Sequence, residues 1–426
     1  MSERLAFTLW AQRSVLQRGA DTPNRTRSHS FWSVMLDLRQ LQDQLADFEK
    51  QQAEHQDRRG AQRDRAGALF EVCHEHWQAV QEAVATAQPR RLVARMREPP
   101  ATVHAAPERP SPITVVATDG SQIYPDRHVE PSFFLLNVSR VAFQYGTTED
   151  ALLDATPSLH FREPLAARFD APLDTIPAEL VSALRDELEL SQLLDVATTA
   201  RVSDRPLVAL ADGTLIRWMI RGMDNEGLEN ELIDRYTEHL EDFRDEGLAL
   251  ASYVSMPAST EVVNLLRYVG GDLDAAPPSL PTDVPDTPRL DGLLDRHVLA
   301  TVLEPGERSA VFGSASHIQG AYPTGTDIAF FYLRVPGPAG GELGRIEVPR
   351  WVADDPTLLD RVHATVLQEC RKGEGYPLVL SEAHERAVVR TSEREAFFRL
   401  MERRLRDAGL GPTGSRKRRS KQRPRV

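Results

Sequence analysis

The sequence predicts an α/β protein whose mixed central sheet is flanked by helices. Residues 115–121 and 207–214 each run as an apolar strand into Asp-Gly followed by Ser or Thr. Between them, residues 177–200 have the apolar spacing of an amphipathic helix. A helix followed by a strand is the usual crossover back to a sheet, so we expect both Asp-Gly turns at one edge of the same sheet.

The bulk composition is that of a globular protein that folds in water. With 426 residues the chain is long enough for two or three structural units, and 41% hydrophobic with 27% charged residues matches globular domains. No apolar run approaches the roughly 20 residues of a membrane helix, and the N-terminus lacks a secretory signal. Cys73 and Cys370 give no disulfide framework and no zinc spacing. We therefore expect a cytoplasmic protein without membrane contact.

The charge is acidic overall and uneven along the chain. A net charge of -12 argues against a surface that is basic throughout, but a local basic channel is still compatible with it. Between Arg416 and Arg425 there are seven positive residues and no negative ones. We expect residues 411–426 to be a disordered, solvated tail, with an arm on a polyanion as the alternative.

The N-terminal part is predicted to form a helical hairpin or a coiled-coil arm. Apolar residues three and four apart indicate helices at 31–53 and 67–88, separated by the polar run 51–65. We assign residues 1–96 to this arm, with a role in packing or dimerisation. Residues 97–112 hold five prolines and are expected to be a linker.

The remaining elements follow from alternation, helical spacing and breaker residues. After the first Asp-Gly turn, two further strands are expected to complete a β-meander. Gly247 is expected to end the helical stretch that follows the second turn. Residues 270–289 carry five prolines and indicate a loop or an insertion. The predicted strands are 132–138, 141–145, 248–255, 328–334 and 344–348, and the predicted helices are 216–246, 261–268, 356–371 and 391–407.

Two carboxylates at the Asp-Gly turns point to a divalent metal site. Ionised Asp119 and Asp212 offer only acceptor oxygens, which suit Mg²⁺ or Mn²⁺. A third carboxylate is expected from the helix at 177–200. Glu187 falls on its apolar stripe, where a carboxylate is unfavourable unless paired or metal-bound. Glu189 falls beside the stripe and is the reserve, and a solvated helix face is the alternative for both.

Two residues near the C-terminus complete the candidate site. His384 suits a proton donor to a leaving group, an orienter of water or a metal ligand. Tyr376 suits a contact to a phosphate or a water, and the alternatives are a core histidine and a packed tyrosine. The sequence holds no Walker A motif, zinc pattern, G-x-S-x-G elbow or G-x-G-x-x-G fingerprint, so the familiar nucleotide-binding and hydrolase functions lack support.

The order of these motifs resembles the NurA nuclease family. The resemblance covers about two-thirds of the chain and rests on the eight-residue spacing from Tyr376 to His384 as well as on the Asp-Gly strands. It implies an RNase H-like core within a nuclease domain at 113–408. It also implies Mn²⁺-dependent 5′-to-3′ exonuclease and single-strand endonuclease activity, with Mg²⁺ as an alternative ion, on single- and double-stranded DNA ends. Its further implications are a homodimer and a HerA-type hexameric ATPase partner in DNA end resection and double-strand break repair. The matched motifs are Val-Val-Ala-Thr-Asp119-Gly-Ser, Leu-Ala-Asp212-Gly-Thr-Leu, Tyr253-Val-Ser-Met-Pro, Phe330-Phe-Tyr-Leu-Arg and Gly-Tyr376-Pro-Leu-Val-Leu-Ser-Glu-Ala-His384.

The resemblance also implies roles for individual residues. Asp119 and Asp212 match the two aspartate metal ligands, and Tyr376 and His384 match the C-terminal tyrosine and histidine, with His384 a further candidate ligand. No motif fixes the helix glutamate relative to Asp212, so Glu187 and Glu189 both stay open.

An acidic chain needs a confined basic path to hold DNA. We expect arginines just after the second Asp-Gly motif, such as Arg217 and Arg221, to contribute, with a solvated helix face as the alternative. The hydroxyls of Ser121 and Thr214 are expected to support the carboxylates or to contact phosphate.

Two other functions compete with the nuclease. One is a DNA-end-binding adaptor without catalysis, which metal-independent DNA binding without cleavage would favour. The other is an actin-like or sugar-kinase-like ATPase, which also places Asp-Gly turns at strand ends and which nucleotide binding would favour.

Overall fold

The computed structural model describes residues 41–126, 130–169, 175–220, 223, 225–273, 277–278, 289–337 and 341–409. The first ten residues of the helix predicted at 31–53, most of the proline-rich segment 270–289 and the basic tail 411–426 lie outside these ranges, as does Arg221. The chain divides into two units, Met1–Gln56 and Asp57–Val426. The domain boundaries set from the sequence stay a prediction.

The site is built on a five-stranded portion of one mixed sheet. Strands β3 (Ile113–Thr118), β5 (Phe133–Tyr145) and β6 (Leu152–Phe161) form an antiparallel meander. Strand β7 (Leu207–Asp212) then pairs parallel with β3, and β8 (Ala249–Val254) pairs parallel with β7. The resulting order, β6-β5-β3-β7-β8, is that of an RNase H-like core, so the predicted fold class is confirmed.

The sheet continues beyond β8 through β12 (Glu342–Pro349) and β11 (Ile328–Val335), which form the predicted late hairpin. The segment predicted as a linker is not only a linker. Its strand β2 (Val103–His104) pairs with β9 (Arg308–Ser309). The other short strands are β1 (Arg95–Met96), β4 (Gly120–Ile123) and β10 (Phe312–Gly313).

Three local predictions were wrong. The strands expected at 132–138 and 141–145 are one strand, β5, because Ser139 and Arg140 continue its pairing with β6. Strand β6 was missed, since none of its residues is buried and it shows no regular apolar alternation. The polar run 51–65 is helical throughout, because Gln, Ala, Glu and Arg favour helix even without an apolar stripe.

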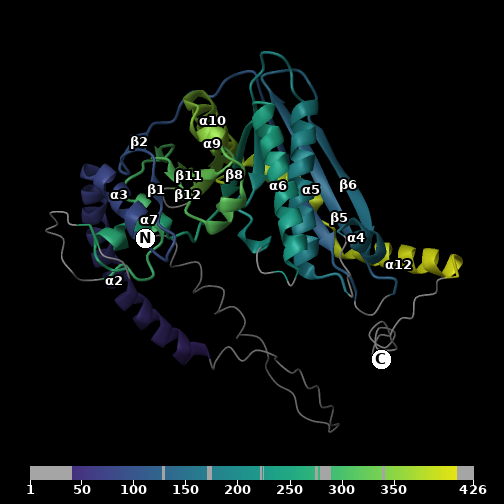
Figure 1. The fold of residues 1–426 in the computed structure, drawn as a ribbon, viewed down its shortest axis with the longest axis horizontal. Helices are drawn as coiled ribbons and strands as arrows, with labels where there is room; N and C mark the ends of the chain where they lie inside the picture. Colours follow the sequence, from purple (N-terminus) through teal and green to yellow (C-terminus); the bar gives the residue numbers. More distant parts are fainter. Residues whose placement is uncertain are drawn as a thin grey trace, which may run out of the picture. The chain divides into compact units, whose positions relative to one another are not determined.

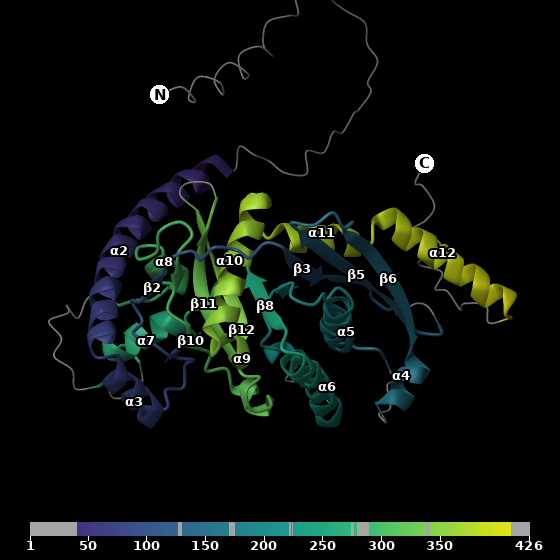
Figure 2. The same ribbon diagram turned by 90° about the horizontal axis from the view of Figure 1, so that it is seen from above.

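Helices cover both faces of the core sheet (Figures 1 and 2). Helices α5 (Ala178–Thr199) and α6 (Glu226–Asp245) lie on one face, and α10 (Pro356–Lys372) and α11 (Leu378–Ala387) lie on the other. In β3, Val116 packs with α5, whereas Val115 and Ala117 pack with the opposite cluster. Strands buried on both faces need continuous apolar runs, and this is why both Asp-Gly motifs follow such runs.

A second core forms at the β11 end of the sheet, where Leu69 and Phe70 pack with Leu266, Phe330 and neighbouring apolar residues. None of the helices in the described part of the chain is long and apolar enough to cross a membrane. The remaining helices are α2 (Leu41–Glu75), α3 (Trp77–Ala87), α4 (Arg162–Arg168), α7 (Glu261–Val269), α8 (Asp295–Leu299), α9 (Arg350–Ala353), α12 (Thr391–Asp407) and the 3-10 turns η1 (Trp218–Ile220) and η2 (His317–Ala321).

Candidate active site

Asp119 and Asp212 stand at matching positions of two neighbouring strands. The parallel register of β3 and β7 places Thr118 opposite Ala211, and each aspartate directly follows its member of this pair: Asp119 comes just after β3, and Asp212 is the last residue of β7. The carboxyl ends of parallel strands are where α/β sheets place their functional groups. The meeting of the two Asp-Gly motifs, expected from the sequence, is therefore present.

The carboxylate of Asp119 is held by backbone and by histidine. Gly120 donates its N–H to Asp119 Oδ1 at 2.8 Å, and His384 Nδ1 lies 2.8 Å from Asp119 Oδ2. His384 projects from α11, and its side chain is 62% exposed. The histidine is thus neither a core residue nor a distant one, and most of its ring is open to an incoming molecule.

Asp212 has the tyrosine as its partner. The hydroxyl of Tyr376 donates to Asp212 Oδ1 at 2.7 Å, and the Tyr376 ring packs edge-on against Tyr253. Neighbouring protein atoms displace water from the Asp212 carboxylate and thereby raise its pKa. The hydrogen bond from Tyr376 lowers the pKa in part, and the negative charge of Asp119 raises it further. The two aspartates therefore repel one another, as carboxylates do when they share a site without a cation.

A tight turn before Tyr376 and the hydrogen bonds at the end of helix α11 position Tyr376 and His384. Gly375, before Tyr376, has φ +113°, which favours glycine, and a Cβ at Gly373 would overlap the Tyr376 carbonyl. At the other end of α11, the Ala387 carbonyl accepts hydrogen bonds from Ser121 and Asn137. The helix is thus fixed to the β4–β5 hairpin next to Asp119.

Glu189 lies against the first Asp-Gly turn. A Cβ added to Gly120 would sit 2.5 Å from Glu189 Oε1, and the Thr118 hydroxyl donates to the Glu189 carbonyl at 2.9 Å. Arg185 Nε pairs with the same carboxylate oxygen at 3.0 Å. Burial raises the Glu189 pKa to about 8, and the charge of Asp119 adds to this rise. Glycine at 120 is therefore required because the glutamate and arginine occupy the space of a side chain.

Glu187, preferred from the sequence, points elsewhere. It pairs with Arg235 at 3.0 Å and His239 at 3.1 Å, both on α6. Burial would raise its pKa, but these hydrogen bonds outweigh burial and lower it. Residues two apart on a helix project about 200° from each other, so α5 can bring only one of the two glutamates to Asp119. In the structure, Glu189 is the glutamate that lies against the turn of Asp119 and Gly120.

Three other expected contacts are not made. Arg217 is 12% exposed, pairs with Asp186 at 3.3 Å and stacks on Tyr236, so these contacts occupy its guanidinium within the fold and do not support its expected part in a confined basic DNA path. The Ser121 hydroxyl donates to the Ala387 carbonyl at the end of α11 and not to a carboxylate of the site. The Thr214 hydroxyl donates to Glu347 at 2.7 Å instead of supporting Asp212.

Comparison with known proteins decides the family. A family model described as NurA domain matches residues 113–389, which span the sheet, both Asp-Gly turns, Tyr376 and His384. The chain belongs to the NurA nuclease family.

A solved structure agrees with this fold. The crystal structure of the NurA nuclease from Sulfolobus solfataricus is similar, with a TM-score of 0.50 and 14% identity over 87% of this chain and 98% of that chain. A second crystal structure, of NurA, has a TM-score of 0.32 and 14% identity over 70% of this chain and 90% of that chain. A search of curated proteins finds no match.

The donor chemistry of this NurA site fits a divalent cation. Asp119, Asp212 and Glu189 offer hard oxygen ligands of the kind that Mn²⁺ and Mg²⁺ bind. The raised pKa values of Asp212 and Glu189 reflect burial together with an excess of negative charge that a cation would neutralise. Within the described ranges, however, no group of three His, Cys, Asp or Glu side chains is arranged to hold an ion, and Glu189 is paired with Arg185.

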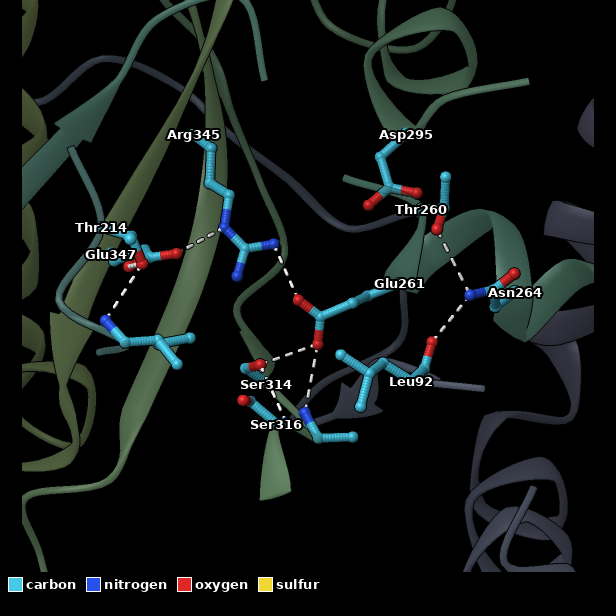
Figure 3. Close-up of polar contacts among 12 residues, drawn as sticks. Leu92, Thr214, Thr260, Glu261, Asn264, Asp295, Ser314, Ser316, Arg345 and Glu347 are labelled. Atoms are coloured by element: carbon cyan, nitrogen blue, oxygen red, sulfur yellow. Dashed lines mark hydrogen bonds and ion pairs between the residues drawn. The ribbon is translucent and has the colours of Figure 1, made fainter. Parts of the chain in front are cut away.

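A buried ionic network beside the NurA site was missed from the sequence (Figure 3). Arg345 binds Glu347 at 2.8 Å and Glu261 at 3.0 Å, and Glu347 also accepts from the Thr214 hydroxyl and the Leu215 N–H. The network therefore fixes the segment that follows Asp212. One signal was available: Arg345 and Glu347 are charged residues on the same face of a strand that is apolar from Leu343 onward at its other positions.

Proposed function

We propose that this NurA chain is a Mn²⁺-dependent DNA nuclease, with Mg²⁺ as the alternative ion. The observation that carries the proposal is the pair of aspartates on adjacent strand ends, each bonded to one of the two C-terminal residues, Tyr376 and His384. Paired carboxylates with a histidine and a tyrosine in reach form a donor set suited to phosphodiester hydrolysis.

The contacts suggest distinct roles for the residues. Tyr376 donates to one oxygen of Asp212, which fixes that carboxylate and leaves its other oxygen as an acceptor. We expect His384, which is exposed and hydrogen-bonded to Asp119, to give a proton to the leaving oxygen of a phosphodiester. Glu189 is the third carboxylate of the proposed site. A cation bound there supplies Lewis acidity and a more acidic water.

The finer activities and partners rest on family membership. We infer 5′-to-3′ exonuclease and single-strand endonuclease activity on DNA ends, and action in end resection and double-strand break repair with a HerA-type hexameric ATPase. We also infer a homodimer. Reconstitution with the ATPase and sedimentation of the purified chain test these two assemblies.

Cleavage of end-labelled DNA tests the nuclease. Single- and double-stranded substrates are incubated with purified protein and Mn²⁺, Mg²⁺ or EDTA, with Asp119→Ala beside it. Glu246→Gln is the control, because Glu246 is 53% exposed and pairs only with Arg201 among the described residues. We expect metal-dependent degradation that Asp119→Ala abolishes and Glu246→Gln retains. No cleavage by the wild type with any metal, with or without the ATPase partner, would refute the nuclease and favour the adaptor or an actin-like or sugar-kinase-like ATPase.

A further inference from the structure

A cavity of about 420 Å³ opens two residues beyond Asp212. Thr214, Ile216 and Trp218, from the segment after β7, form one side of it, and Val254, at the end of β8, forms another. Since Asp212 is paired in register with Tyr253, the cavity adjoins the same strand ends that carry the candidate site.

The walls of this cavity suit a flat, mostly apolar group. Both of its carboxylates, Glu261 and Glu347, are ion-paired with Arg345, so neither is left unpaired in the cavity wall (Figure 3). Trp218 is 60% exposed, although large aromatic side chains are usually buried. An exposed indole beside a cavity is a platform on which an unpaired nucleobase can stack.

A second cavity, of about 790 Å³, adjoins the first. Leu92 lines both, and along the segment 314–317 Ser314 and Ser316 face the first cavity whereas Ala315 and His317 face the second. The two cavities are therefore separated only by this segment and the Leu92 side chain.

The second cavity is basic. Arg90, Arg91 and Arg95 line it, and all three are exposed. None of the three forms an ion pair with another residue that the structure describes. The chain has a net charge of -12, so a cavity lined by several unpaired arginines is a local positive site to which the phosphates of a nucleic acid would bind.

We propose that the two cavities form one path for a single DNA strand that leads to Asp212. An unstacked base lies on Trp218 in the first cavity, and the sugar-phosphate backbone runs past Leu92 to the arginines of the second. Single strands fit better than duplex, because only an unpaired base exposes the face that stacks on the indole. The path rests on the proposed nuclease function and names its substrate-binding surface.

An acidic partner protein is the other occupant that arginines would attract. It has no need for an aromatic platform next to the catalytic carboxylates, so the position of Trp218 favours DNA. The two occupants differ in what the variants lose, which the following experiment measures.

Fluorescence anisotropy with labelled oligothymidine in EDTA measures binding without cleavage. We expect Trp218→Ala to weaken binding about tenfold, and Trp218→Phe to restore most of it, because stacking on one aromatic ring is worth about 1–3 kcal/mol per base. The triple change of Arg90, Arg91 and Arg95 to Gln is expected to reduce the slope of log affinity against log salt by about 2, since each phosphate contact contributes about 0.7 for a single strand.

The control for the arginines is the triple change of Arg403, Arg404 and Arg406 to Gln on α12, which removes the same charge from another exposed surface. Equal effects of the two triples, unchanged binding by Trp218→Ala, or no binding of single strands by the wild type would overturn the path. Loss of ATPase binding with DNA binding intact would assign the surface to a protein partner instead. If the wild type cleaves DNA but the Trp218 and arginine variants bind single strands as well as the wild type does, the path is refuted and the nuclease stands. If the variants lose binding as expected but the wild type cleaves no DNA with any metal, the nuclease is refuted and the path stands.

Discussion

Replacing Glu347 by alanine is expected to lower the free energy of unfolding by about 3–5 kcal/mol, the usual effect of removing one partner of a buried ion pair. Glu347 is 2% exposed and Arg345 is 3% exposed, so water cannot take over the lost contacts. The alanine leaves Arg345 Nε, the Thr214 hydroxyl and the Leu215 N–H without the acceptor that each has at 2.7–2.9 Å.

Urea unfolding followed by circular dichroism measures this loss. The matched control is Glu246→Ala, which removes a carboxylate 3.0 Å from Arg201 on an exposed surface and is expected to cost no more than about 1 kcal/mol. Because Thr214 and Leu215 follow Asp212, cleavage by the folded fraction of the Glu347 variant should also fall. Equal shifts of the unfolding midpoint in the two variants would refute the conclusion that the buried network contributes more to the free energy of unfolding than an exposed ion pair does.

Three further changes test other parts of the structure. Glu189→Gln is expected to lower metal-dependent cleavage by more than about tenfold, whereas Glu187→Gln leaves it nearly unchanged; equal losses in the cleavage rate would contradict the assignment of Glu189. Gly120→Ala is expected to destabilise by about 1–3 kcal/mol in urea, because its Cβ collides with the Glu189 carboxylate, while Gly60→Ala, with no atom near its Cβ, should be neutral or stabilising. Burial lowers the pKa of His363 to about 4, so its contribution to stability is complete above pH 6.5 and is lost as the pH falls toward 4, by about 3 kcal/mol in all. His363→Gln should remove this part of the pH dependence of unfolding, and an unchanged dependence would show that the histidine is not buried in its neutral form.

The sequence was sufficient for strands β3 and β7 and for their meeting at one edge of the sheet, because each leaves a local trace. The runs before Asp119 and Asp212 are apolar on both faces, and the helix between them implies a crossover. The sequence could not decide between Glu187 and Glu189. The buried face of α5 includes Val181, Leu190 and Leu193, so it is rotated from the apolar stripe that the spacing of Leu180, Leu184, Leu188 and Leu194 predicts. That rotation is set by packing on α6 and β3, not by α5 itself.

Contacts between distant segments were equally out of reach. No local sequence pattern in α7 predicts that Glu261 forms an ion pair with Arg345, which lies 84 residues further along the chain. Arg217 was expected in solvent because arginine usually is, and only the fold shows that Asp186 and Tyr236 enclose it. The exposed Trp218 could not be told from a core tryptophan for the same reason.

The contact between His384 and Asp119 joins residues 265 positions apart. During synthesis, a chain that has already exposed both aspartates still lacks Tyr376, His384 and the helix that carries the histidine. Such a chain has the carboxylates of the site but not the groups that orient them. The proposed DNA-cutting centre can therefore assemble only after the segment that carries His384 has left the ribosome.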